Sequence, residues 1–419
     1  MQKLIIKGKK ALSGKISISG SKNATLPILA ATILTKNVLV KNIPLVKDIF
    51  TMCELLNFIG LKTIINKKKN TIEIKNNEKN IKTFAPYKLV KTMRAGVLVL
   101  GSLLTKYGNA KISLPGGCAI GTRPVDLHLF ALKKLGAKIK IKDGYILAEA
   151  KKGLKGTIIN FPSISVGATE NALLAATNAK GKTVLKNCAI EPEIKDLIAF
   201  LKKKGSIINL KGRTITIIKR KSILSRIIHN VMFDRIELGT YMIAGALAAK
   251  NNITIDKINP KIVKNEIKVL SKIGVRIIEK KSSVIIKKTR NLKKIIITTK
   301  PYPGFPTDLQ AQLMILLTQV NGVSKIKEDI FENRFMHVPE LKRMGAQIKI
   351  KNRTAIITGP TKLSGAEVMA TDLRASVSLV LAGLIANNKT IINRIYHLDR
   401  GYEFLEEKLK NCKAEIRRV

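Results

Sequence analysis

One cysteine stands in a loop whose composition favours chemistry over packing. Cys118 lies within residues 114–124, which read Leu-Pro-Gly-Gly-Cys-Ala-Ile-Gly-Thr-Arg-Pro, so that three glycines and two prolines surround the thiol. Structural cysteines are typically buried in helices and strands, so a thiol in an exposed, mobile loop is a candidate for a chemical role. Cys53, Cys188 and Cys412 lie on or beside amphipathic or strand-like segments, and we interpret them as structural.

A second candidate site begins at Gly20. Gly20 and Ser21 form a turn that leads into a predicted helix bearing Lys22 at its start. Backbone N–H groups at a helix N-terminus, together with an ammonium group, suit an anionic ligand. The segment is not a Walker A loop, because the spaced first glycine is missing. An ordinary capped helix start remains the alternative.

Five arginines share one kind of position. Each lies at a predicted helix start or in a turn, where side chains can converge on a ligand: Arg94, Arg123, Arg334, Arg374 and Arg400. The planar guanidinium group suits bidentate binding of phosphate or carboxylate. A single such arginine would more often be a structural ion-pair partner, but five in comparable positions favour an anionic substrate.

Candidates for a general acid or base are few. Asp308 lies at the start of a predicted helix, where capping is the alternative to a catalytic role. The four histidines, at positions 128, 229, 337 and 397, are scattered without a metal pair or a catalytic triad. The four cysteines also lack the spacing of a disulfide framework or a metal site. We therefore predict no metal and no cofactor.

A repeat of about 70 residues organises the chain around these candidates. The pattern Leu-x-x-x-Gly recurs at residues 56–60, 132–136, 201–205, 270–274 and 341–345, with a degenerate sixth copy at 409–413. Successive leucines are 76, 69, 69, 71 and 68 residues apart. The glycine is expected to end an amphipathic helix with a positive φ. Fixed spacing of this kind is typical of a repeated structural unit.

Each repeat is predicted to be helix, strand, helix, strand, strand. Its first helix is rich in small residues and nearly apolar all round, which suits burial among helices of the same kind. These first helices are expected at residues 23–34, 93–104, 168–179, 235–249, 308–320 and 373–386. We predict an α/β (α+β) fold of two domains with three repeats each, in which sheets and amphipathic helices surround a helical core.

The N-terminal strands, within residues 3–20, precede the first repeat and are expected to pair with the last repeats. One domain would then be continuous, at residues 22–229. The other would be discontinuous, at residues 1–21 plus 230–419. Two strand crossings would form a hinge, and the cleft between the halves is the expected active site.

The charge of the chain is high but does not dictate a polyanionic partner. Lys and Arg number 77 against 28 Asp and Glu, a formal net charge of +49, and 61 of the 77 are Lys. Lys, Ile and Asn share AT-rich codons, so we interpret most of this excess as solvated lysine produced by mutational bias. Aromatic residues make up 4% and Trp is absent, which leaves few rings for base stacking.

The sequence predicts a soluble cytoplasmic protein. No apolar run approaches the roughly 18 residues of a membrane span, and the N-terminus returns to charge too soon for a signal peptide. We expect small-molecule substrates, no nucleic-acid or membrane partner, and a monomer or weak homo-oligomer.

Together the motifs resemble the UDP-N-acetylglucosamine 1-carboxyvinyltransferase (enolpyruvyl transferase) family. They follow one another along the whole chain: Gly20-Ser21-Lys22-Asn23, Pro115-Gly116-Gly117-Cys118, Arg123-Pro124-Val125-Asp126-Leu127-His128, Ser165-Val166-Gly167-Ala168-Thr169, Glu191-Pro192-Glu193-Ile194, Thr307-Asp308, Phe331-Glu332-Asn333-Arg334-Phe335-Met336-His337 and Asp399-Arg400-Gly401-Tyr402. The family's fold is an inside-out α/β barrel of two domains with three such units each, which agrees with the repeat count.

The resemblance implies transfer of the enolpyruvyl group of phosphoenolpyruvate to the 3'-hydroxyl of UDP-N-acetylglucosamine, with release of phosphate. This is the first committed step of peptidoglycan biosynthesis. Cys118 would be the general acid and would form a covalent adduct with phosphoenolpyruvate, and Asp308 would accept the hydroxyl proton. Lys22 and Arg400 would complete the catalytic set. An epoxide phosphonate such as fosfomycin should alkylate Cys118.

The resemblance also implies which residues bind each substrate. Phosphoenolpyruvate would contact Lys22, Asn23, Arg123, Arg334, Arg374 and Arg400. UDP-N-acetylglucosamine would contact Asn23, Arg94, Arg123, Pro124, Val125, Asp126, Leu127, Ser163, Ile164, Ser165, Val166, Gly167, Asp308 and Ile330. Ser163 departs from the lysine that the family often has, so the diphosphate contact is expected to be weaker or supplied by a neighbouring lysine.

Two other functions are weighed against this one. A 5-enolpyruvylshikimate-3-phosphate synthase-like transferase shares the fold and the donor, but the cysteine loop and residues 123–127 argue against it. A basic nucleic-acid-binding protein would need a clustered patch with steeply salt-dependent binding. Lysine here is spread over nearly every outer helix and turn.

Overall fold

The computed structural model describes residues 2–78, 80–91, 93–115, 125–220, 225–289 and 291–419. Two compact units divide the chain. Of the described residues, those up to Ser19 and those from Phe233 onward form one unit, here called the terminal unit. Those from Gly20 to Met232 form the other, here called the central unit.

The central unit contains seven α-helices among its described residues, two short 3-10 helices and twelve strands. The helices are α1 (Lys22–Ala31), α2 (Lys47–Ile59), α3 (Tyr87–Val90), α4 (Val99–Tyr107), α5 (Asp126–Lys134), α6 (Val166–Ala176), α7 (Pro192–Lys203), η1 (Thr32–Leu34) and η2 (Arg94–Leu98). The strands are β3 (Asn37–Lys41), β4 (Lys62–Asn66), β5 (Thr71–Lys75), β6 (Phe84–Ala85), β7 (Asn109–Ser113), β8 (Lys138–Lys142), β9 (Tyr145–Glu149), β10 (Ile158–Asn160), β11 (Lys182–Lys186), β12 (Ile207–Lys211), β13 (Thr214–Ile218) and β14 (Arg226–Asn230).

The terminal unit has a matching set of elements. Its helices are α8 (Arg235–Ala248), α9 (Lys264–Lys272), α10 (Gln310–Leu317), α11 (Val338–Arg343), α12 (Leu373–Ile385), α13 (Leu405–Asn411), η3 (Pro260–Val263), η4 (Thr307–Leu309) and η5 (Ile395–Arg400). Its strands are β1 (Leu4–Lys7), β2 (Leu12–Ser17), β15 (Ala249–Asp256), β16 (Arg276–Glu279), β17 (Ser283–Lys287), β18 (Ile296–Thr298), β19 (Gly322–Lys327), β20 (Gln347–Lys351), β21 (Thr354–Gly359), β22 (Glu367–Met369), β23 (Lys389–Asn393) and β24 (Glu415–Arg418).

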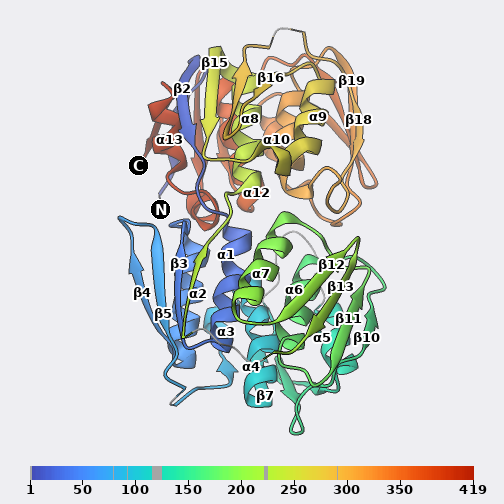
Figure 1. Ribbon diagram of the computed structural model, residues 1–419. Coiled ribbons are helices and arrows are strands. Elements are labelled where there is room, and N and C mark those ends of the chain that lie inside the picture. The colour runs from blue at the N-terminus through green and yellow to red at the C-terminus, as the bar shows by residue number, and fades with distance from the viewer. Residues whose placement is uncertain (1, 79, 92, 116–124, 221–224, 290) are drawn as a thin grey trace. The chain divides into compact units, whose positions relative to one another are not determined.

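Each unit has an interior of helices that the sequence predicted to be apolar all round. In the terminal unit α8, α10 and α12 contact one another, and in the central unit α4 contacts both α1 and α6 (Figure 1). Their residues are buried on every face, and each unit has its own hydrophobic core. The predicted arrangement of a helical core surrounded by sheets and amphipathic helices is confirmed.

Three four-stranded sheets enclose each core. Their strand orders are β14-β3-β5-β4, β6-β7-β9-β8 and β10-β11-β13-β12 in the central unit, and β2-β15-β17-β16, β18-β19-β21-β20 and β22-β23-β1-β24 in the terminal unit. In each order the first two strands are parallel and the other pairs are antiparallel. The repeat therefore has a fourth strand that the sequence pattern did not predict. This fourth strand lies at the edge of each sheet. In four sheets it is only two or three residues long, too short to show an alternation of apolar and polar residues: β6, β10, β18 and β22.

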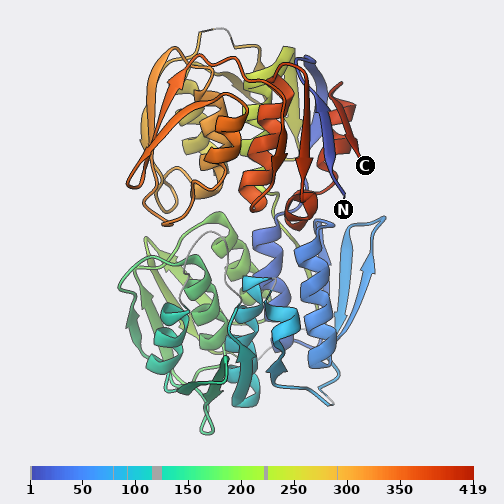
Figure 2. The ribbon, with the colours of Figure 1, turned by 180° about the vertical axis from the view of Figure 1, so that it is seen from behind.

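The N-terminal strands complete the terminal unit, β1 in the sheet of the sixth repeat and β2 in that of the fourth. Strand β2 is parallel to β15, and β1 lies between β23 and β24 (Figure 2). The sixth repeat ends at β24 without a closing strand of its own, and β1 takes the place that β13 or β21 has in other repeats. The chain ends are thus held in one sheet.

The glycines of the repeat end helices in the left-handed region, as predicted. Gly60, Gly136, Gly205, Gly274 and Gly345 have φ values between 95° and 116°. In the degenerate sixth copy Lys413 takes the same position with φ 71°, so the backbone keeps its conformation where the glycine is missing.

None of the helices in the described part of the chain is both long enough and apolar enough to cross a membrane.

Candidate active site

The predicted site residues fall into two groups, one in each unit, and three of them lie outside the described residues. Those three are Cys118, Arg123 and Pro124. The central unit contributes the start of α1, the start of η2, the first turn of α5 and the segment that leads into α6. The terminal unit contributes the segments before α10 and α11, the first turn of α12 and the end of η5.

Lys22 is held by an acidic partner that the sequence did not suggest. The Ser21 hydroxyl accepts a hydrogen bond from the Ala24 N–H at 3.2 Å, so Ser21 caps the N-terminus of α1. The segment is thus a capped helix start. Lys22 Nζ also lies 3.0 Å from Asp48 Oδ2, in the first turn of α2. Both side chains are largely buried, 11% and 7% exposed, which fixes the ammonium in one place. Asn23 follows, half-buried, on the same helix turn.

His128 brings the predicted nucleotide-binding segments together. It follows Asp126 and Leu127 in α5, and Asn171 Nδ2 lies 3.1 Å from His128 Nδ1. A Cβ added to Gly167 would come within 3.1 Å of the imidazole ring, so glycine allows the start of α6 to approach it. Burial, and secondly Arg94, lower the pKa of His128 to about 4, which keeps the ring neutral.

The segment before α6 is accessible. Ser163 and Val166 are exposed, Ile164 and Gly167 are half-buried, and the Ser165 hydroxyl caps α6 by accepting from the Ala168 N–H at 3.3 Å. Val125, the N-cap residue of α5, is buried, and Asp126, the first residue of α5, is exposed.

Three carboxylates gather behind this group. Glu170 in α6, and Glu191 and Glu193 at the start of α7, are all buried. Burial, followed by the charges of Glu193 and Glu191, raises the pKa of Glu170 well above its ordinary value. Glu170 therefore tends to stay protonated where the other two carboxylates lie close by. Sequence analysis did not predict this cluster, because Glu170 and the other two residues belong to separate helices.

Asp308 pairs with two predicted anion-binding arginines. Its Oδ1 accepts from Arg334 Nη2 at 2.5 Å and its Oδ2 accepts from Arg374 Nη2 at 2.6 Å. The guanidinium side chains are 4% and 8% exposed, whereas that of Asp308 is 26% exposed. The N-cap position before η4 is Pro306 and the Asp308 carboxylate binds arginines, so the capping alternative is wrong. Although burial disfavours the Arg374 guanidinium, the Asp308 carboxylate outweighs it and raises the pKa of Arg374.

A buried carboxylate that the sequence analysis missed connects the neighbouring segments. Glu328 Oε1 accepts from the Ile330 and Phe331 N–H groups at 2.9 and 3.1 Å, and its Oε2 accepts from Thr307 Oγ1 at 2.9 Å. Ile330 thus lies half-buried in a segment fixed next to Asp308.

Arg334 and Arg400 occupy different surroundings. The Arg334 guanidinium lies 5.3 Å from the Phe331 ring centroid. His337, near Arg334, is buried, and burial lowers its pKa to about 4. The negative charge of Asp372 opposes this shift, and the positive charge of Arg334 adds to it. Arg400 is the last residue of η5 and is half-buried.

The three described cysteines are buried and unreactive in character. Burial is the main cause that raises the pKa of Cys53 and Cys188 to about 12 and that of Cys412 to about 11. Since the thiolate is the reactive form, their interpretation as structural is supported.

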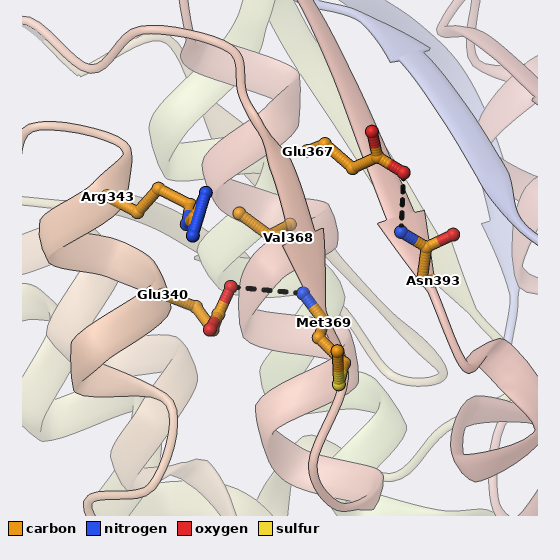
Figure 3. A pocket seen from close by; sticks show the side chains of 6 residues that line it. All are labelled: Glu340, Arg343, Glu367, Val368, Met369 and Asn393. Carbon is orange, nitrogen blue, oxygen red and sulfur yellow. Dashed lines mark hydrogen bonds between the residues drawn. The ribbon is translucent and has the colours of Figure 1, made fainter.

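No group of three or more metal-ligating side chains occurs among the residues that the structure describes. A groove of about 340 Å³ lies beside α11 and β22 in the terminal unit, lined by Glu340, Arg343, Glu367, Val368, Met369 and Asn393 (Figure 3). Its acids are engaged within the fold, since Glu340 accepts from the Met369 N–H and Glu367 accepts from Asn393 Nδ2. None of the predicted site residues lines it.

Known proteins share both the sequence and the fold. A family model described as EPSP synthase (3-phosphoshikimate 1-carboxyvinyltransferase) matches residues 6–409. The chain is 57% identical over 420 residues to a UDP-N-acetylglucosamine 1-carboxyvinyltransferase of Pelagibacter ubique and 52% identical to one of Rickettsia prowazekii, with full coverage of both chains in each case.

Two solved structures have the same fold at low sequence identity. The enolpyruvyl transferase NikO of Streptomyces tendae superposes with a TM-score of 0.89 at 24% identity, covering 100% of this chain and 99% of the other. An EPSP synthase of Acinetobacter baumannii superposes with a TM-score of 0.75 at 18% identity and the same coverage. These likenesses concern the fold alone. The full-length sequence matches carry the assignment further: the chain belongs to the EPSP synthase family of enolpyruvyl transferases, among the relatives named UDP-N-acetylglucosamine 1-carboxyvinyltransferase.

Proposed function

We propose that this chain transfers the enolpyruvyl group of phosphoenolpyruvate to the 3'-hydroxyl of UDP-N-acetylglucosamine and releases phosphate, the first committed step of peptidoglycan synthesis. The observation that carries the proposal is Asp308 with Arg334 and Arg374, which offers a proton acceptor and two anion-binding groups in one place. Relatives at 51–57% identity are named UDP-N-acetylglucosamine 1-carboxyvinyltransferase, which supports the choice of acceptor.

Fixed cations suit the donor. Phosphoenolpyruvate and the nucleotide sugar are both multiply anionic, and preorganised charges stabilise them without reorganisation during the reaction. Lys22, held 3.0 Å from Asp48, meets that requirement in the central unit. The proposal assigns phosphoenolpyruvate to Lys22 and Asn23, to Arg334 and Arg374, and to Arg123 and Arg400.

The chemistry is addition followed by elimination. The 3'-hydroxyl oxygen bonds to C2 of phosphoenolpyruvate while C3 takes a proton. Cys118 is the proposed donor of that proton, since a thiol with an ordinary pKa of about 8.5 is mostly protonated at neutral pH. Loss of a proton from C3 and of phosphate from C2 then restores the double bond.

Asp308 must exchange partners to act as the base. A carboxylate that accepts two charge-assisted hydrogen bonds is a weak proton acceptor. The carboxylate and phosphate groups of phosphoenolpyruvate compete for the same two guanidinium groups. Their binding would release Asp308 toward the 3'-hydroxyl, which couples donor binding to activation of the acceptor.

The nucleotide is assigned to the surface around His128. Gly167 approaches this imidazole, Arg94 lowers its pKa, and residues 125–127 directly precede it in the chain. The sugar is assigned to the segment of Asp308 and Ile330, which Glu328 fixes.

Phosphate release from phosphoenolpyruvate, measured with and without UDP-N-acetylglucosamine, tests the proposal. Release that depends on this acceptor is expected. Release with shikimate 3-phosphate instead would favour the synthase named in the family description. Release without any acceptor, or none at all, would overturn the proposal.

The role of Cys118 has a separate test. Fosfomycin combines an anionic phosphonate with an electrophilic epoxide, so it should add its own mass to Cys118 when UDP-N-acetylglucosamine is present. Cys118→Asp should keep an acid, retain turnover and resist alkylation, whereas Cys118→Ser should lose most turnover. Intact mass spectrometry without an adduct on wild-type protein would remove Cys118 from the mechanism.

A further inference from the structure

Three buried polar side chains of the terminal unit form a hydrogen-bonded cluster next to the Asp308–Arg374 pair. Thr240 is in α8, Gln312 is in α10, and Tyr402 lies between η5 and α13. Their exposed fractions are 1%, 0% and 4%. Most residues of α8, α10 and α12 are apolar, and polar groups buried among them need hydrogen-bond partners.

The direction of each hydrogen bond in this cluster can be worked out. The Thr240 hydroxyl donates its single proton to the Ile236 carbonyl at 2.8 Å. Thr240 Oγ1 lies 2.8 Å from the Tyr402 hydroxyl and must therefore accept the Tyr402 proton. Burial raises the pKa of Tyr402, which keeps the phenol protonated for this bond.

The Tyr402 oxygen is then left with lone pairs that face donors. It accepts from Gln312 Nε2 at 3.2 Å and from Arg374 Nη1 at 3.4 Å. The second contact is long, but it reaches the guanidinium whose Nη2 binds Asp308 at 2.6 Å. Tyr402 therefore restrains the side of Arg374 that Asp308 does not bind.

Gln312 holds the other partner of the ion pair. Its Nε2 donates to the Asp308 backbone carbonyl at 2.9 Å and also lies 3.2 Å from Thr240 Oγ1. Its Oε1 is buried and has no partner in the described structure. A buried amide oxygen without a partner costs free energy. We therefore infer that Gln312 is present for the hydrogen bond that its Nε2 donates to the Asp308 carbonyl.

We propose that Tyr402, Thr240 and Gln312 are positioning residues that hold Asp308 and Arg374 in the positions that the transfer reaction requires. The inference rests on the proposed function. The cluster restrains the Asp308 backbone and the Arg374 guanidinium from one buried centre. When the donor takes Arg374 from Asp308, the cluster keeps both groups at the site.

The test compares Tyr402→Phe with Tyr241→Phe in the full chain. Tyr241 is 1% exposed in α8, and its hydroxyl has no partner in the described structure, so Tyr241→Phe is a matched loss of one buried hydroxyl. We expect Tyr402→Phe to raise KM for phosphoenolpyruvate and lower kcat, with kcat/KM falling roughly tenfold or more. KM for UDP-N-acetylglucosamine should not change. Tyr241→Phe should match wild type.

Thr240 provides a second, independent comparison. Thr240→Ser keeps the hydroxyl and should retain wild-type kinetics, whereas Thr240→Val should behave as Tyr402→Phe does. A purely structural role would reduce the folded fraction and the apparent kcat but leave both KM values unchanged. Unchanged KM for phosphoenolpyruvate in Tyr402→Phe, or equal defects in both Thr240 variants, would overturn the inference while leaving the proposed function standing. A wild-type chain without acceptor-dependent phosphate release would overturn both.

Discussion

The last strand of the chain holds the segment that carries Arg400. Arg418 in β24 binds Asp399 through Nη2 and Nη1 at 2.6 and 3.0 Å. It also binds Glu406 in α13 through Nε at 2.5 Å and Nη2 at 3.3 Å. Asp399 directly precedes Arg400 at the end of η5. Arg418→Ala should therefore affect both stability and substrate binding.

The magnitude follows from the geometry. Removing Arg418 leaves the carboxylates of Asp399 and Glu406, 33% and 13% exposed, without their shared cation. Breaking a fully buried ion pair would cost more, but solvent screens these partly exposed carboxylates. We therefore expect Arg418→Ala to lower the free energy of unfolding by about 3 kcal/mol. For a unit of this size that corresponds to a fall in Tm of about 6 to 12 °C.

The assay is thermal unfolding of the full chain, followed by phosphate-release kinetics below the transition. Arg417→Ala is the matched control, because Arg417 is the adjacent arginine on the same strand, carries the same charge and is exposed. The control should shift Tm by less than about 2 °C, since exposed charges contribute little. Arg418→Ala should also raise KM for phosphoenolpyruvate several-fold, because Asp399 no longer fixes the end of η5.

Equal Tm values for the two alanine variants would show that the hydrogen bonds of Arg418 to Asp399 and Glu406 contribute nothing. A lower Tm with unchanged KM would keep the stabilising role but refute the connection to Arg400.

Three further predictions concern titratable groups. Asp308→Asn should lower kcat roughly a hundred- to ten-thousandfold in the phosphate-release assay, whereas the exposed Asp329→Asn should have no such effect; comparable losses would contradict the proposed base. For His128 the folded-state pKa, about 4, is below the unfolded value near 6.5. The unfolded state thus binds the proton first, and about 3 kcal/mol of stability is lost as pH falls from 6.5 to 4. Urea unfolding should show this loss, and His128→Gln should flatten it; an unchanged slope would refute it. For Glu170 the pKa is raised in the folded state. Its contribution to the free energy of unfolding is therefore fully present below the unfolded-state pKa and is lost as pH rises. Glu170→Gln should consequently stabilise the protein at pH 8, and a destabilised variant would contradict the burial argument.

The sequence by itself determined the repeated architecture. A pattern of 12 to 15 residues is enough to predict a helix that is buried on all faces, and the glycine of Leu-x-x-x-Gly is enough to predict a positive φ at the helix end. The same patterns placed Lys22 and Asp308 at helix starts; Lys22 is the first residue of α1, and Asp308 lies in η4, directly before α10. The short edge strand β10 was missed, because three residues carry no periodicity.

Only the tertiary structure decided which groups face one another. Lys22 and Asp48 are 26 residues apart, and Arg374 and Asp308 are 66 apart. Such pairs form because packed helices bring their ends together, which no local pattern encodes. The closing strand β1 is likewise fixed by the strands it pairs with at the far end of the chain. The physical reason is range: hydrophobic periodicity acts within one element, whereas the pairing of buried charges and polar groups depends on how several elements pack.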